Sequence, residues 1–162
     1  MRRDPGGFSL VELLIVVAII LIIAAIAIPS FLRSRIAANQ ASAIESMRNI
    51  GTAEVNYWVT YGQGFSTSLS ALGPPPEGVQ ANSTAAGLID EVLASGAKSG
   101  YVFIYSPADL DASTGRYNGF SLNGNPAIFG STGTAYYYSD QSHVIRGNST
   151  AVATSTDSAV AN

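Results

Sequence analysis

Glu12 is the residue whose position in this sequence most clearly requires a chemical partner. It stands inside a strongly apolar run that extends from Phe8 to Ile28. A carboxylate in the middle of a membrane-spanning helix costs about 2.5–3.5 kcal/mol, so a compensating cation is expected. Cleavage of the bond between Gly7 and Phe8 would create an amine about one helical turn from Glu12. That amine could pair with Glu12 within one chain or between staggered copies; the alternative is a glutamate that reaches toward the membrane interface.

Other residues with catalytic chemistry are few and scattered. His143 is the only histidine and the chain has no cysteine. A catalytic triad or a metal cluster at His143 would need partners that the local sequence does not show, so we predict that His143 is a strand residue. Gly62 and Gly64 follow a predicted helix and do not match a phosphate-binding loop. The sequence therefore predicts no enzyme, no catalytic residue and no cofactor.

One short segment has the spacing of oxygen ligands. Asp109, Asp111 and Ser113 alternate as in a calcium-binding loop, but Gly115 is displaced from its position in such a loop and no glutamate closes it. No metal site is predicted, and whether Asp109 and Asp111 bind calcium stays open.

The apolar run is the element that must position Glu12. As a helix its roughly 21 residues would extend about 31 Å, close to the hydrocarbon thickness of a bilayer. The run is longer than the apolar core of a secretory signal peptide, which has about 7–15 residues. Arg2 and Arg3 before it favour a cytoplasmic amino terminus, although Arg33 and Arg35 after it weaken the asymmetry. The run is therefore predicted to cross a membrane.

The helix is predicted to continue past the apolar run as far as Tyr61. Pro29 lacks an amide donor and clashes with the preceding turn, which predicts a helix kink. Glu54 falls within the apolar arc of the second half, and we expect it at the edge of that arc with access to solvent. The arc itself consists of Met47, Ile50, Gly51, Val55, Tyr57, Trp58 and Tyr61.

The remaining sequence predicts a small α+β head. A short helix is expected within residues 84–95, and strand-like runs occupy residues 101–105, 116–123, 127–129, 134–140 and 143–146. Turn residues at 107–109 and 123–126 separate some of these runs. The pattern predicts an antiparallel β-meander of about four strands, packed on the long amino-terminal helix.

The amino-terminal segment resembles a known family. Gly7 before Phe8, the following Ser-Leu-Val-Glu, the long aliphatic run and Pro29 are similar to type IV prepilins and to the related pseudopilins of type II secretion. The resemblance covers about residues 2–35. It implies a pilin fold, cleavage after Gly7 by a prepilin peptidase, N-methylation of Phe8, and guidance of assembly by Glu12.

The residue patterns and the resemblance together predict how the chain is divided. Residues 1–7 would be a leader peptide and residues 8–35 the transmembrane and filament-core half of the helix. Residues 36–146 would form the globular head, including the amphipathic helix half. Residues 147–162 would be a tail rich in Ser, Thr and Ala, with a composition typical of flexible or surface segments.

The function implied by the resemblance is that of a structural subunit of a type IV pilus, used for adhesion, twitching motility or DNA uptake. Its partners would be identical subunits in a helical homopolymer, the prepilin peptidase, an inner-membrane assembly platform, and membrane lipid before assembly. The precursor would cross the bacterial inner membrane once and then enter an extracellular pilus. The net charge of −3, with scattered basic residues, predicts no dedicated nucleic-acid site.

Two alternatives remain open at this stage. The first is a pseudopilin of a type II secretion system, a class whose major members often bind calcium in their carboxy-terminal region. The second is a membrane-anchored enzyme or binding module that uses its helix only as a tether. Under the second alternative Glu12 would be a costly residue without a role.

Overall fold

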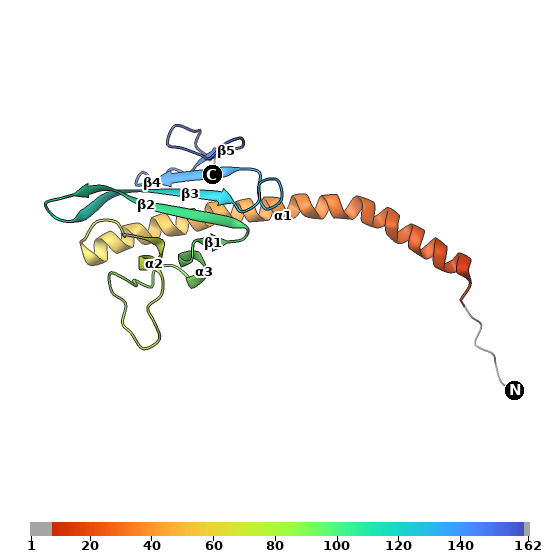
Figure 1. Ribbon diagram of the computed structural model, residues 1–162, viewed down its shortest axis with the longest axis horizontal. Helices are drawn as coiled ribbons and strands as arrows, with labels where there is room; N and C mark the ends of the chain where they lie inside the picture. The colour runs from red at the N-terminus through yellow and green to blue at the C-terminus, as the bar shows by residue number, and fades with distance from the viewer. Residues whose placement is uncertain (1–7, 161–162) are drawn as a thin grey trace. The chain divides into compact units, whose positions relative to one another are not determined.

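The computed structural model describes residues 8–160 (Figure 1). The chain divides into two compact units, residues 1–35 and residues 36–162. Its elements are α1 (Leu10–Tyr61), α2 (Leu69–Leu72), α3 (Glu91–Ala94), β1 (Ala97–Lys98), β2 (Tyr101–Asp111), β3 (Arg116–Pro126), β4 (Tyr136–Asp140) and β5 (Arg146–Asn148).

The described part of the first unit is one segment of helix α1 and the two residues before it. Helix α1 is long and apolar enough to cross a membrane, and none of its most apolar stretch is buried. Pro29 lies inside the helix, whose assignment continues without a break on both sides of it. The kink predicted at Pro29 therefore stays a prediction.

The second unit has the predicted α+β fold. Its five strands are antiparallel and adjacent in chain order, so they form a meander. Figure 1 shows this sheet alongside the carboxy-terminal half of α1. The prediction of about four strands missed β1, because a two-residue edge strand is too short to leave a pattern in the sequence.

The longest hairpin, β2 with β3, runs through both predicted turns. Pro107 lies inside β2 opposite Phe120, and Asn123 lies inside β3 opposite Ile104. Strand β1 pairs only as far as Val102, so the outer edge of β2 is free at Pro107 and the missing amide interrupts no ladder. The predicted turns at 107–109 and 123–126 are therefore wrong.

Two other predicted strands and the predicted helix differ from the structure. Residues 127–129 form a loop closed by an isolated bridge between Phe129 and Gly133. His143 also lies in a loop, since β5 begins at Arg146. The helix expected within residues 84–95 is only the single turn α3, because Gly87 has a φ of 67° and breaks the segment before it.

The core of the second unit lies between α1 and the sheet. Two residues of the predicted apolar arc, Val55 and Trp58, are 44% and 41% exposed, so the buried stripe of α1 is narrower than predicted. Phe65 covers part of the Trp58 ring edge-on, with the ring centroids 4.7 Å apart. The buried apolar cluster is made of Ala43, Met47, Ile50, Ala53, Tyr57, Phe65, Leu69, Leu72, Ala86, Ile89, Leu93, Tyr101, Phe103, Phe120, Leu122 and Tyr137.

The segment after β5 packs on the sheet through polar contacts. Asn148 donates to the Asp157 carboxylate at 2.8 Å, and the same carboxylate accepts the backbone N–H of Thr154 at 2.7 Å. Asn123 of β3 donates to the carbonyl of Ala153 at 2.9 Å, and Ala153 is buried. These hydrogen bonds hold in place a segment whose composition alone gives no packing signal.

Candidate assembly site

The amino-terminal end of α1 is organised by Glu12 and Ser9. The helix begins at Leu10, so Ser9 precedes its first residue and Glu12 is its third. The Ser9 backbone N–H donates to Oε2 of Glu12 at 2.9 Å. This contact is half of a capping box, in which a glutamate reaches back to a backbone donor that has no partner within the helix. The Ser-x-x-Glu spacing in the sequence signals this contact, which we did not predict.

Phe8 and the second carboxylate oxygen of Glu12 both lie open beside the start of α1. Phe8 lies before the helix and is 82% exposed. One carboxylate oxygen of Glu12 is used by Ser9, while no hydrogen bond to the other oxygen occurs within residues 8–160. A carboxylate that has one oxygen available can still accept a cationic donor. Gly7, the other side of the predicted cleavage site, lies outside the described residues.

The amino-terminal half of α1 exposes an apolar surface on all of its sides. Leu10, Ile19 and Ile26 are 77%, 51% and 74% exposed, and the other large apolar side chains of this half are exposed as well. Soluble monomers rarely show contiguous apolar patches of this extent, which mark contacts with lipid or protein. This segment therefore requires either lipid or other helices around it.

In the Asp109–Ser113 segment, the Asp111 carboxylate is hydrogen-bonded within the turn that it begins. Asp111 accepts the backbone N–H of Ser113 at 2.8 Å and the hydroxyls of Ser113 and Thr114 at 2.6 and 2.7 Å. These donors lower the pKa of Asp111 to about 2. Within residues 8–160 no three His, Cys, Asp or Glu side chains group as metal ligands. Asp111 and Ser113 are therefore bonded to each other in the turn between β2 and β3, and Asp109 takes no part in these bonds.

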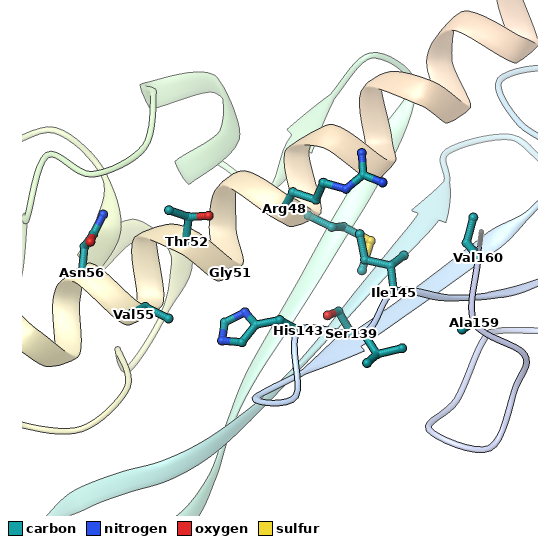
Figure 2. Close-up of a pocket in the computed structure, with 12 residues that line it drawn as sticks. Arg48, Gly51, Thr52, Val55, Asn56, Ser139, His143, Ile145, Ala159 and Val160 are labelled. Carbon is teal, nitrogen blue, oxygen red and sulfur yellow. The ribbon is translucent and has the colours of Figure 1, made fainter. Parts of the chain in front are cut away.

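His143 lies in a pocket of about 680 Å³ beside α1. Figure 2 shows its ring pointing toward the helix next to Gly51. A Cβ added at Gly51 would be 2.7 Å from Nδ1 of His143, so the ring occupies the space left by the glycine. Ser139 lines the same pocket, but no hydrogen bond joins it to His143 among the bonds of the described residues. The nucleophile–base contact of a hydrolase is therefore absent from this pocket.

Glu54 is not at the solvent-exposed edge that the sequence predicted. Its side chain is completely buried, and Oε2 accepts the Ser66 backbone N–H at 2.9 Å while Oε1 lies 2.5 Å from the Ser66 hydroxyl. Burial raises the pKa of the Glu54 carboxyl. The edge prediction failed because the partner lies in the segment that follows α1, and helical periodicity carries no information about that segment.

Comparisons with known proteins concern the amino-terminal part of the chain. The sequence model described as "Prokaryotic N-terminal methylation motif" matches residues 2–28. The Type IV major pilin protein PilA of Myxococcus xanthus (strain DK1622) is 38% identical over 71 residues. This match covers 44% of the present chain and 32% of that relative, so it spans about a third of the relative's length. No solved structure matches the chain.

Proposed function

We propose that this chain is a structural subunit of an extracellular type IV pilus. The premise is its membership of the type IV pilin family, which its amino-terminal segment supports. The observation that carries the proposal is an acidic residue near the start of an exposed, membrane-length apolar helix. The role is structural and assigns no catalytic residue. The outputs proposed for the pilus are adhesion, twitching motility or DNA uptake.

The proposed assembly pathway starts in the membrane. Residues 1–7 are a leader that a prepilin peptidase removes after Gly7, and the new terminal residue, Phe8, is then N-methylated. The apolar helix of residues 8–35 stays in the inner membrane until an assembly platform delivers the subunit to the fibre. There the same helix packs among identical helices, while residues 36–146 form the head and residues 147–162 complete its surface.

Glu12 is proposed to pair with the amine of Phe8 during assembly. Pairing between copies is supported by two features of the helix start. Phe8 lies outside the helix, so it does not occupy the position one regular turn before Glu12. Ser9 of the same chain already binds one oxygen of Glu12, which leaves the second oxygen for a donor from a neighbour. The kink proposed at Pro29 would adapt the helix to its neighbours in the bundle.

Electron microscopy of material sheared from the cell surface tests the proposed function. We expect long thin fibres that contain this chain, their loss on deletion of the gene, and their return on complementation. Immunogold labelling and mass spectrometry of the purified fibres identify the subunit. Absence of such fibres, together with loss of protein secretion on deletion, would instead support a type II secretion pseudopilin.

Replacing Gly7 with Leu is expected to block processing, because the peptidase site proposed here requires a small residue before Phe8. Intact-mass measurement should find the full precursor in the Gly7→Leu strain and a shortened, methylated chain in the unsubstituted strain. Gly6→Leu is the matched control, since it adds the same side chain one residue earlier and should be processed. A normal mature mass from Gly7→Leu would contradict the proposed cleavage site.

A further inference from the structure

The buried Glu54 carboxyl joins three segments of the head. It projects from α1 and receives two contacts from Ser66 after the helix, and Ser66 in turn is bound by Tyr105 of β2. The Tyr105 hydroxyl donates to the carbonyl of Ser66 at 2.9 Å. Glu54 and Ser66 are both 0% exposed. This arrangement, the Glu54 cluster, consists of Glu54, Ser66 and Tyr105.

The hydrogen atoms of the Glu54 cluster can be counted. The Ser66 hydroxyl has one hydrogen but two acceptors, Oε1 of Glu54 at 2.5 Å and the Ser68 carbonyl at 3.1 Å. The Tyr105 hydroxyl likewise has one hydrogen, which it donates to the Ser66 carbonyl. An ionised Glu54 must therefore take a hydrogen that a backbone carbonyl also accepts. A protonated Glu54 supplies a hydrogen of its own, and both hydroxyls can then donate to the carbonyls.

The charges around Glu54 agree with this count. The titratable groups that act on it are Tyr57 of α1, Tyr105 of β2 and His143 of the loop before β5. Burial raises the pKa of both tyrosines, which are neutral acids and offer no positive charge. His143 is exposed and acts only at longer range. A buried carboxylate without a close cation is unfavourable, and such groups bind a proton instead.

We propose that Glu54 is a buried proton-binding site, whose carboxyl group stays protonated in the folded head at a pH where an exposed glutamate is ionised. The proton is donated to the Ser66 hydroxyl, and this bond holds the segment after α1 against the helix and the sheet. The site is independent of the assembly role proposed for Glu12 and uses residues of the second unit only.

The site gives the stability of the head a defined pH dependence. Burial raises the pKa of Glu54 above its ordinary value of 4.5, so the folded head binds a proton that the unfolded chain releases. Its contribution to the free energy of unfolding is complete below pH 4.5 and is lost as the pH rises through the folded-state pKa. This pH dependence is opposite to that of an ion-paired carboxylate, whose contribution to the free energy of unfolding is lost as the pH falls.

Infrared titration of the full chain in detergent micelles tests the site. We expect the carbonyl stretch of a protonated carboxylic acid to persist above pH 4.5, after the exposed carboxyls have ionised, and to be missing from Glu54→Gln. Glu45→Gln, an exposed position on the same helix, should leave this band unchanged. A Glu54 midpoint at or below 4.5 would overturn the proposal.

Unfolding measurements across pH supply a second test. Gln has the shape of a protonated glutamate, donates to the Ser66 hydroxyl and accepts the Ser66 N–H, so Glu54→Gln should stay folded and lose the pH dependence. Glu54→Ala removes both contacts and should unfold at lower denaturant concentration at every pH. If neither variant folds, NMR titration of the glutamate carboxyl carbons in the unsubstituted chain gives the midpoint directly. Equal stability of the Ala and Gln variants would contradict the proposed hydrogen bonds.

Discussion

Replacing Glu12 with Ala is expected to reduce fibre yield to the limit of detection while leaving the head folded and the chain in the membrane. Removing one member of a buried ion pair costs about 3–5 kcal/mol, because the other charge stays buried without a partner. A difference of that size shifts an equilibrium by more than about a hundredfold. Quantitative immunoblots of sheared fibres and of membrane fractions measure the two pools.

Glu12→Gln separates the charge of Glu12 from its contact with Ser9. Glutamine can serve in a capping box, so the start of α1 should be preserved, but it has no charge to pair with an amine. We expect Glu12→Gln to assemble as poorly as Glu12→Ala. Normal assembly of the Gln variant would mean that the cap, and not the charge, is what the fibre requires.

The features predicted correctly from the sequence are those encoded by neighbouring residues. The apolar run, the long helix and the prepilin-like start are local patterns. Strands β2 and β3 were predicted over part of their length and β4 over all of it. The Ser9–Glu12 contact is also local, since it spans three residues, and it could have been predicted from the capping-box signature.

The features predicted wrongly depend on segments that are distant in the chain. Proline usually indicates a turn. Pro107 is tolerated in β2 because β1 pairs only with the start of β2 and leaves the outer edge of β2 uncovered at Pro107. His143 lies in a turn, with a φ of 59° and its N–H donating to the Asp140 carbonyl, and its ring lies beside Gly51, about 90 residues away. Neither the length of β1 nor the missing side chain at position 51 can be inferred from the sequence around these residues.

Glu12 and Glu54, two of the three glutamates of α1, show how the same residue type acquires different chemistry. Both stand among apolar residues of one helix, but Glu12 is exposed in the first unit and Glu54 is buried in the second. The described partner of Glu12 is the backbone N–H of Ser9 at the start of the same helix. In the proposed bundle, its cation would have to come from a neighbouring copy. Glu54 receives hydroxyl and amide contacts from its own head and needs no cation if it holds a proton. Tertiary partners therefore decide whether an apolar-face glutamate acts as a charge or as a neutral hydrogen-bond donor.

The glycine that brings Ser66 to Glu54 should be among the least replaceable residues of the head. Gly64 has a φ of 83°, and a Cβ at this position would overlap the carbonyl oxygen of Tyr117, which accepts the Phe65 N–H at 2.9 Å. Backbone atoms cannot move aside without breaking that bond, so Gly64→Ala should destabilise the head by about 3 kcal/mol or more and lower its melting temperature by about 10 °C.

Gly62→Ala is the control that isolates this clash. Gly62 has a similar φ of 64°, but nothing lies within 4 Å of a Cβ added there. Its replacement should therefore cost only the backbone strain of alanine at positive φ, about 1–2 kcal/mol. Thermal unfolding followed by circular dichroism compares the two variants. Because strain is common to both, the difference between them measures the contact between Gly64 and Tyr117, and equal melting temperatures would show that this contact does not hold the segment in place.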